Sequence, residues 1–394
     1  MSWLPFSWGL TLLIPPVLYA VAMLRFRQAW QQLPALPGLS DQAQKNQADH
    51  SILARELPKL SVLIAARNEA ENLPGLLQDL QEQTLPVAQF EVIIVDDHST
   101  DATAALVQQW AKKLPFCLRL LALAEAPGQG TGKKAALEAA LAVARAPWVV
   151  CTDADCRVPA DWLRLHALAA ANPATHFVSG PVRLTGAGWL AQLQALEMAG
   201  LVGVGAACIA QQASTMCNGA NLGYRRSTFQ AVGGFAGNHH LASGDDEFLL
   251  HKIQQRNPGG IQFLKEAKAT VSTAAQGTIP ALLRQRVRWA SKWPHYQTTA
   301  PQRLAVVVLL ANVALFLGLV SLLVWPVLWP WVAGGWLLKL GADMVFLRPV
   351  LRLLGRGELL WWVLPLQLLY APYALAVALG ARRGQYQWKG RQVK

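Results

Sequence analysis

Long apolar runs lie at both ends of the chain. The first, Met1 to Leu24, carries no charged side chain and is followed at once by Arg25 and Arg27. An apolar helix of this length can cross a bilayer, and basic residues favour its cytoplasmic end. A cleaved signal peptide would carry its positive charge before the apolar run. We therefore expect residues 1–27 to form a transmembrane anchor whose N-terminus lies outside.

A second apolar region lies near the C-terminus. Leu304 to Leu338 is a run of 35 uncharged residues, which exceeds one membrane span. A turn rich in Trp and Pro divides it, so we expect a hairpin of two helices at about 303–324 and 330–347. Lys339 and Asp343 stand one helical turn apart in the second helix and can pair with each other.

A third apolar run, Leu359 to Ala381, has positive charge on both sides, because Arg356 precedes it and Arg382 follows it. Basic residues at both ends conflict with a simple span. Either the run is re-entrant or interfacial, or the charge rule fails here. We assign residues 301–384 to the membrane region and 385–394 to a basic tail.

The middle of the chain has the pattern of a globular domain. Residues 28–58 are predicted to be a polar linker, and residues 59–300 alternate short buried strands with amphipathic helices. The predicted strands are Leu60–Ala65, Glu91–Val95 and Trp148–Thr152, and the predicted helices are Ala70–Gln83, Thr103–Leu114 and Lys133–Ala144. This alternation predicts an α/β fold with a mostly parallel sheet and helices on both faces. Ligands of such sheets bind at the carboxyl ends of the strands.

Composition narrows the classes of partner. The net charge of +12 is compatible with nucleic acid, an anionic membrane or phosphate-bearing substrates. Much of the basic charge flanks the apolar runs, which favours a membrane, and no nucleic-acid-binding module is recognised in the sequence. The five cysteines contain no CxxC pair, which argues against a zinc site or a disulfide framework.

The third predicted strand is followed by Asp153-Ala154-Asp155. Two carboxylates at this spacing can bracket a hard divalent cation, Mg²⁺ or Mn²⁺, that would bridge to a diphosphate. The alternative interpretation is a solvated turn in which an aspartate caps the next helix.

Two other loops carry candidate chemistry near the same edge of the sheet. Asp97 follows the second strand and can bind a nucleoside base or ribose, while Asp101 can cap the next helix. The glycine-rich loop 128–132 precedes Lys133 and Lys134, and such a loop at a helix N-terminus can hold phosphate oxygens. Its spacing is not that of a P-loop, and the alternative is a flexible surface loop.

Two motifs remain in the second half of the domain. Asp245 and Asp246 are adjacent carboxylates, and each raises the pKa of the other, which suits a general base. They also suit the start of a helix, where acidic residues complement the dipole. The segment Gln285 to Trp289 carries Arg288, which can stabilise a diphosphate, although an interfacial amphipathic helix has the same composition.

In their order along the chain, these motifs resemble the family 2 inverting glycosyltransferases with a GT-A fold. The matching stretches are SVLIAARNEAENL, VIIVDDHSTD, GKKAAL, TDADC, NGANLGYRR, GDDEF and QRVRW. The flanking apolar runs resemble the membrane-bound branch of that family, which includes ceramide glucosyltransferases and cellulose and hyaluronan synthases.

The resemblance implies a role for each matching residue. A nucleotide pocket would be lined by Ala66, Glu69 and Asp97, the diphosphate would be approached by Lys133 or Lys134, and the donor and metal would be held by Asp153 and Asp155. Asp246 aligns with the catalytic base, beside Asp245 at a position where many relatives have Glu. The leaving group would be stabilised by Arg288, and the acceptor side would include Asn221, Gln285 and Trp289.

The expected function is transfer of a sugar, with inversion, from a nucleotide-sugar donor to a lipid or saccharide acceptor. UDP is the common nucleotide of the resembled family. The expected enzyme is an integral protein of the inner or plasma membrane whose catalytic domain is cytoplasmic. Few membrane helices favour a single transfer to a lipid or lipid-linked acceptor. The alternatives are a processive polysaccharide synthase and a non-catalytic membrane scaffold.

Overall fold

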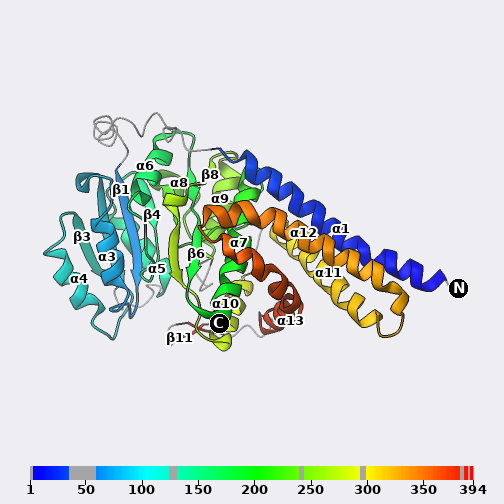
Figure 1. The fold of residues 1–394 in the computed structure, drawn as a ribbon. Coiled ribbons are helices and arrows are strands. Elements are labelled where there is room, and N and C mark those ends of the chain that lie inside the picture. The colour runs from blue at the N-terminus through cyan, green and yellow to red at the C-terminus, as the bar shows by residue number, and fades with distance from the viewer. Residues whose placement is uncertain are drawn as a thin grey trace.

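The protein consists of a sheet domain from which a long helical arm extends (Figure 1). The computed structural model describes residues 3–34, 59–123, 131–238, 244–292, 299–381, 386–388 and 391–393. Most of the predicted linker 28–58 lies outside the described residues, as do positions 128–130 of the glycine-rich loop.

A seven-stranded sheet forms the centre of the domain, in the order β3–β2–β1–β4–β7–β5–β8. The strands are β1 Leu60–Ala66, β2 Phe90–Asp96, β3 Cys117–Ala122, β4 Trp148–Cys151, β5 Phe177–Ser179, β7 Leu222–Arg225 and β8 Ile261–Phe263. Strands β1 to β4 pair in parallel, and β7 runs antiparallel to both of its neighbours. A separate parallel pair joins β6 (Val182–Thr185) to β9 (Val271–Ala274). The predicted α/β fold with a mostly parallel sheet is confirmed.

Alternation along the strands explains why both faces of the sheet are covered. Leu63 of β1 faces one hydrophobic cluster, while its neighbours Val62 and Ile64 face the other. Helices α3 (Leu73–Gln81), α4 (Thr103–Ala111) and α6 (Trp162–Ala171) supply the second cluster, and α5 (Lys133–Val143), α7 (Gly188–Ala210), α8 (Arg226–Ala231) and α9 (Asp245–Arg256) supply the first. The strands and helices predicted for the first half of the domain therefore exist, with ends displaced by up to a few residues.

Helix α7 was not predicted, although it joins the two parts of the molecule. Glu197 is its one charged residue, and Gln192 and Gln194 are polar, but the helix is otherwise apolar on all sides, a pattern typical of a buried helix. An ideal Cβ on Gly203 would come within 2.8 Å of Val350 on α12, so the glycine allows the two helices to approach closely. The core of the sheet domain is thus continuous with the base of the helical arm.

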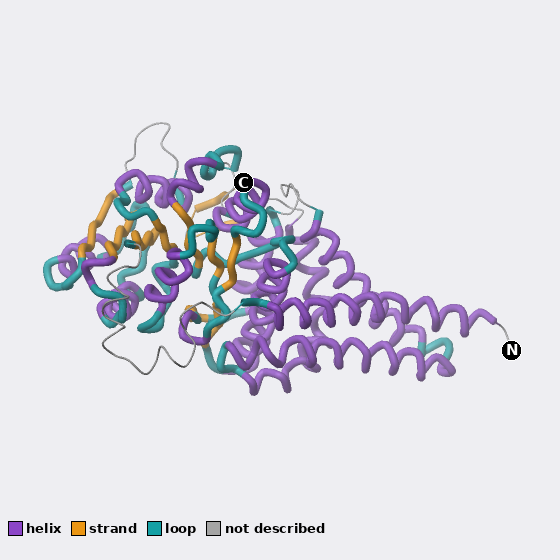
Figure 2. The backbone as a smooth tube through the Cα atoms, turned by 90° about the horizontal axis from the view of Figure 1, so that it is seen from above, coloured by secondary structure: helices purple, strands orange, loops and turns teal. Residues whose placement is uncertain are grey.

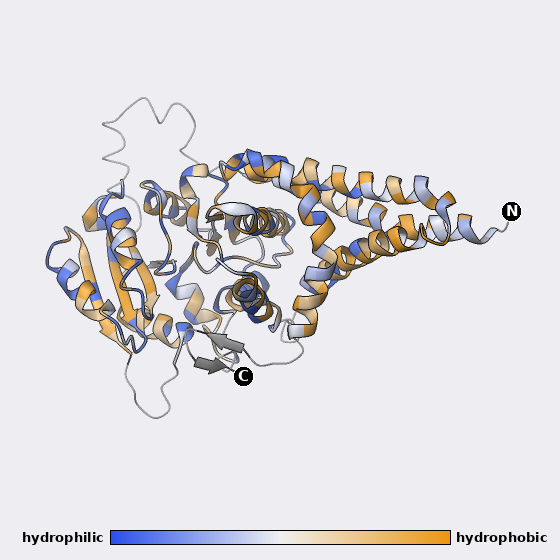
Figure 3. Cartoon of the chain, turned by 60° about the horizontal axis from the view of Figure 1, so that its bottom comes forward, coloured by the Kyte–Doolittle hydropathy of each residue, from blue (hydrophilic) through white to orange (hydrophobic). Residues whose placement is uncertain are grey.

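The arm is built from α1 (Trp3–Gln32), α11 (Ala300–Ser321) and α12 (Trp329–Leu353). These helices run side by side in two views, and the arm that ends at the N-terminus is mostly hydrophobic (Figures 2 and 3). Pro5–Gln32, Gly188–Ala210, Ala300–Ser321 and Gly357–Ala381 are long and apolar enough to cross a membrane. The predicted hairpin is present as α11 and α12, and the predicted pair of Lys339 and Asp343 forms with Nζ and Oδ2 2.8 Å apart.

Helix α13 (Val363–Ala381) runs steeply across the direction of the other arm helices (Figures 1 and 3). Before it, Arg356 donates to the carbonyl of Leu184 and to Gln192 Oε1 in the sheet domain. Near its end, Gly380 packs closely against Val287 of α10 (Ile279–Ala290), since an ideal Cβ there would lie 2.6 Å from Val287 Cγ2. Both ends of this run therefore lie against the sheet domain and α10.

Candidate active site

The carboxyl ends of β1, β2 and β4 meet at one edge of the sheet, where β1 has a neighbour on each side. Residues Ala66 and Asp96 are in register, and the Asp97 amide donates to the carbonyl of Ala66 at 2.8 Å. Arg67 Nη1 donates to the carbonyl of Asp97 at 2.8 Å. This edge is the place where open α/β sheets bind ligands.

The loop after β1 is fixed to the loop after β2. The amide of Glu69 donates to Thr103 Oγ1 at 2.8 Å, and the Glu69 side chain is buried. Asp101 Oδ1 accepts from the amide of Thr103 at 3.0 Å, at the first residue of α4. Asp101 therefore serves the start of the helix, whereas Asp97 lines the cavity described below.

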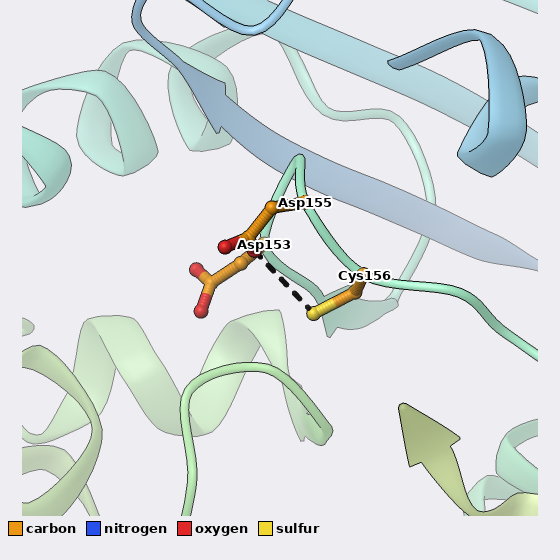
Figure 4. Close-up of side chains that lie close together, drawn as sticks. All are labelled: Asp153, Asp155 and Cys156. Atoms are coloured by element: carbon orange, nitrogen blue, oxygen red, sulfur yellow. Dashed lines mark hydrogen bonds between the residues drawn. The ribbon is translucent and has the colours of Figure 1, made fainter. Parts of the chain in front are cut away.

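Two carboxylates follow β4. Asp153 is half-buried and Asp155 is exposed, and their oxygens lie within 4.8 Å of each other and of Cys156 Sγ (Figure 4). The Cys156 thiol donates to Asp155 Oδ1 at 3.8 Å. Burial raises the pKa of this thiol well above its usual value, so the thiol stays neutral. The cluster offers hard carboxylate oxygens, which suit Mg²⁺ or Mn²⁺ better than the soft metals that prefer thiolates.

The two lysines at the start of α5 have different surroundings. Lys133 Nζ lies 2.6 Å from Asp153 Oδ1 and 3.5 Å from Asp245 Oδ2. Burial opposes the Lys133 charge, but these two carboxylates outweigh it and raise the lysine pKa well above its usual value. Lys134 Nζ instead donates to the carbonyl of Asn238 at 2.6 Å, and Lys134 is not among the residues that line the cavity.

Helix α9 begins with three acidic residues that face the same space. Asp246 Oδ2 accepts from the amide of Gly219 at 2.9 Å, and Glu247 pairs with Lys292 at 2.9 Å. Burial raises the pKa of Asp246 to about 6, and the nearby carboxylates of Asp245 and Glu247 add to the effect, against the opposing charge of Lys292. A carboxylate with this pKa is a suitable proton acceptor near neutral pH.

The motif from Gln285 to Trp289 lies on helix α10. Its residues Gln285, Arg288 and Trp289 line the same cavity. Buried contacts with α7 hold this helix in place. Arg286 binds Glu197 Oε2 of α7 through Nη2 at 2.7 Å, and its guanidinium lies 4.3 Å from the centre of the Trp289 ring. The indole is thereby held in one orientation beside the site.

Asn221 is not among the residues that line this cavity. Its side chain is fully buried, and Oδ1 lies 2.9 Å from Trp162 Nε1 and 3.1 Å from His166 Nε2. Its Nδ2 donates to the carbonyls of Pro181 and Ala269 at 2.8 Å each. With every polar atom engaged, Asn221 stabilises the loops under the site, and the acceptor contact predicted for it does not fit this position.

One cavity of about 1140 Å³ connects these groups to the helical arm. Its lining at the domain end includes Ala66, Glu69, Asp97, Lys133, Asp153, Asp155, Asp245 and Asp246. At the other end it reaches Tyr19 of α1, Asp343 of α12 and Gln367 of α13.

Family models match this chain over the same elements. The model described as Glycosyl transferase family 2 matches residues 61–233, and the one described as Glycosyl transferase family group 2 matches residues 148–374, which is more than half of the 394 residues. The chain belongs to glycosyl transferase family group 2. Its cavity is therefore the candidate active site of a family 2 glycosyltransferase.

Curated relatives of this glycosyltransferase resemble it over short stretches. A beta-monoglucosyldiacylglycerol synthase of Nostoc sp. is 36% identical over 112 residues, which are 28% of this chain and 23% of that protein. A dolichyl-phosphate beta-glucosyltransferase of Dictyostelium discoideum is 37% identical over 103 residues, or 24% of this chain and 30% of that protein. The chain thus spans about a quarter of the length of the curated relatives that it matches.

A solved structure extends the likeness of this glycosyltransferase to its fold. A mannosyltransferase from Pyrobaculum calidifontis, in complex with GDP-Man and Mn²⁺, superposes with a TM-score of 0.59 and 21% identity. The superposition covers 96% of this chain and 97% of that one. At this level of identity the match shows a shared GT-A fold.

Three residues that contact or line the site of this glycosyltransferase were not predicted from the sequence. Glu197 lies in an apolar helix that was not predicted, Lys292 follows the recognised motif on α10, and Tyr19 lies in an N-terminal apolar run. For Glu197 and Tyr19 the available signal was a lone charge or hydroxyl within an apolar run, since such groups need a partner when buried.

Proposed function

We propose that this glycosyltransferase transfers a sugar from a nucleoside diphosphate sugar to a lipid or lipid-linked acceptor. The observation that carries the proposal is the continuous cavity, which joins Asp153, Asp155 and Asp246 to residues of the membrane helices. A donor site that opens between apolar helices suits an acceptor whose hydrocarbon part stays in the bilayer.

The names of the relatives support the same function. One relative is named for glucosylation of diacylglycerol and another for glucosylation of dolichyl phosphate. The structural neighbour holds GDP-mannose and Mn²⁺. The two relatives are thus named for lipid acceptors and the structural neighbour for a nucleotide sugar, while the donor nucleotide, UDP or GDP, is left for experiment.

In the proposed donor site, Ala66, Glu69 and Asp97 face the nucleoside and Lys133 faces the diphosphate. Asp153 and Asp155 would hold a divalent cation, Mg²⁺ or Mn²⁺, because both offer carboxylate oxygens at the cavity wall. The bound cation would supply positive charge that stabilises the departing diphosphate. Lys133 already balances Asp153 at 2.6 Å, so this position accommodates a cationic group.

The proposed reaction is a single displacement. Asp246 accepts the proton of the acceptor hydroxyl, and the hydroxyl oxygen attacks the anomeric carbon. The bond from that carbon to the diphosphate oxygen breaks, the bonding electrons leave with the nucleoside diphosphate, and the anomeric centre inverts. Arg288 contributes positive charge on the leaving-group side, while Gln285 and Trp289 of the same helix border the acceptor.

The proposed location is the inner or plasma membrane, with the catalytic domain in the cytoplasm. Arg25 and Arg27 lie near the end of α1 that meets the sheet domain, where the carbonyl of Trp30 accepts from Lys265 Nζ at 2.7 Å. Basic residues favour the cytoplasmic end of a membrane helix. The exposed apolar side chains of α1, α11 and α13 then face lipid.

The test is a transfer assay on the full chain in detergent with a membrane lipid extract. UDP- and GDP-sugars would be supplied with Mg²⁺ or Mn²⁺, and lipid products would be analysed by mass spectrometry. We expect one donor to yield a lipid that carries one added sugar. A ladder of products would favour the processive synthase, and absence of donor binding and of turnover would favour the non-catalytic scaffold.

Glu71→Gln provides a matched control for substitutions of the site carboxylates, because Glu71 is exposed and does not line the cavity. Asp246→Asn should abolish the product while Glu71→Gln keeps it. Near-normal transfer by Asp246→Asn would contradict the proposed role of Asp246 as the base.

A further inference from the structure

The membrane end of the cavity is lined by polar side chains from helices α1 and α12. Tyr19 Oη donates to Asp343 Oδ1 at 2.5 Å, and Lys339 Nζ donates to Asp343 Oδ2 at 2.8 Å. The Lys339 ammonium also lies 4.7 Å from the centre of the Tyr19 ring. Charged groups among apolar helices are costly unless they pair in this way. The polar groups of these three residues are therefore paired with one another.

Gln367 of α13 lines the same cavity and has no such partner. Only 5% of its surface is exposed, and it lines the cavity. Neither Oε1 nor Nε2 has a hydrogen-bond partner among the residues that the structure describes. A buried amide without partners is destabilising, so a polar group of a ligand that reaches this amide from the cavity would stabilise it.

The charge of this end of the cavity restricts the ligand. On α1, α11, α12 and α13, the charged residues in the described lining are Lys339 and Asp343, which pair with each other. Glu197 of α7 is paired with Arg286. The described lining of these helices therefore offers a lipid phosphate no unpaired cation, whereas an uncharged polar group needs none. The remaining basic lining residues, among them Arg284 and Arg288, lie on α10 and at the domain end.

The remaining lining suits hydrocarbon chains. Val308 and Leu309 of α11 and Leu366 and Val377 of α13 border the same cavity. Apolar walls with a few convergent polar groups are typical of sites for amphipathic small molecules.

We propose that Gln367, in the cavity that the pair of Lys339 and Asp343 also lines, forms a subsite for the polar part of an uncharged lipid. Its Nε2 donates to an ester carbonyl of the lipid, such as a carbonyl of a diacylglycerol. This subsite holds the acceptor by its linkage region while the reactive hydroxyl extends toward Asp246. The assignment rests on the proposed function, and it selects neutral lipids over lipid phosphates as acceptors.

The test measures lipid binding separately from sugar transfer. Binding of dioctanoylglycerol and of farnesyl phosphate to the full chain in detergent would be followed by tryptophan fluorescence. We expect wild type to prefer dioctanoylglycerol. We expect Gln367→Leu to weaken this binding by about tenfold, because the hydrogen bond to the lipid is lost. Leu368→Ala is the control, since Leu368 is the next residue and is 56% exposed on the outer face.

Thermal melting without lipid measures the stability of the variants independently of lipid binding. Gln367→Leu removes an unpaired buried amide, so its Tm without lipid should equal or exceed that of wild type, while its stabilisation by dioctanoylglycerol should shrink. If Gln367→Leu fails to fold, Gln367→Asn keeps the amide but shortens its reach and should weaken binding in the same direction. Wild-type affinity in these variants, or tighter binding of farnesyl phosphate than of dioctanoylglycerol, would overturn the subsite.

The two proposals fail in different ways. Binding of dioctanoylglycerol that depends on Gln367, without sugar transfer to any acceptor, would support the subsite and contradict the proposed function. Transfer to a lipid with undiminished binding in Gln367→Leu would contradict the subsite and leave the proposed function standing.

Discussion

The backbone amide of Gly219 donates to Asp246 Oδ2 at 2.9 Å. This bond fixes the side chain that we propose as the base, and it requires close approach of the loop before β7. An ideal Cβ on Gly219 would lie 2.8 Å from Lys133 Nζ and 3.5 Å from Asp246 Oδ2. A glycine here therefore lets the base, the lysine and the loop share one small space.

Gly219→Ala should impair catalysis more than folding. The atom nearest to the added methyl group is the end of the flexible Lys133 side chain, which can move aside. Its displacement from Asp153 should lower kcat by up to about a hundredfold, since small misplacements in a site have effects of that size. Gly277→Ala is the control, because nothing lies within 4 Å of its Cβ. Steady-state kinetics and melting curves of both variants check this, and an unchanged kcat in Gly219→Ala would contradict it.

The transfer rate should depend on pH through Asp246. Burial raises the pKa of this group to about 6, and the base acts in its deprotonated form. Activity should therefore be full above that pKa and fall as the pH is lowered through about 6. Asp246→Asn should lower kcat by about 10²- to 10⁴-fold and remove this acid limb. Initial rates from about pH 5 to about pH 8 measure the profile, and a flat wild-type profile would argue against the assignment.

Removal of divalent cations should stop transfer. Asp153 and Asp155 provide the proposed ligands, so EDTA should abolish activity and Mg²⁺ or Mn²⁺ should restore it. Asp155→Ala should lose at least about a hundredfold in kcat, because a bound cation stabilises the departing charge by several kcal/mol. Initial rates with and without EDTA measure the effect, with Glu71→Gln as the control. Full activity in EDTA would rule out the metal site.

The buried pair in the arm should contribute to stability. Asp343→Leu leaves the Lys339 ammonium without its partner, which should cost about 3–5 kcal/mol. The double variant Lys339→Met with Asp343→Leu removes both charges and should recover most of that loss. Unfolding in detergent, followed by circular dichroism, compares the three proteins. A double variant as unstable as the single one would show that charge pairing is not the cause.

The C-terminus should lie on the same side of the membrane as the catalytic domain. Arg356 before α13 and Gly380 near its end both contact the sheet domain. A reporter fused after Lys394 should therefore be active only in the cytoplasm. A reporter active on the opposite side would mean that α13 crosses the bilayer. A fusion before Met1, which we expect to lie outside, provides the comparison.

Local patterns in the sequence were sufficient to predict the first half of the sheet. β1, β2 and β4 are continuous buried runs that end in polar residues, and the order of the elements fixes their carboxyl ends at one edge. The site residues after these strands could therefore be located from the sequence. Helix α7 and the reversed strand β7 could not, because no local signal distinguishes a buried apolar helix from a membrane span or sets the direction of a short strand.

Long-range contacts account for the other differences between the site predicted from the sequence and the site in the structure. The sequence does not distinguish Lys133 from Lys134, since the direction of each side chain depends on the packing of α5. Asn221 belongs to a recognised motif, yet it is buried by Trp162 and His166, which lie more than fifty positions earlier. The connection from the site to Gln367 arises only when α13 folds back against the domain.

The most direct measurement of lipid glycosylation is the ratio of nucleoside diphosphate released to glycolipid formed by the full chain, with one labelled donor and neutral lipid. We expect one glycolipid for each nucleoside diphosphate, dependent on Mg²⁺ or Mn²⁺, and neither product from Asp246→Asn. Release of nucleoside diphosphate with no labelled lipid, or equal product from Asp246→Asn, would contradict lipid glycosylation through this cavity.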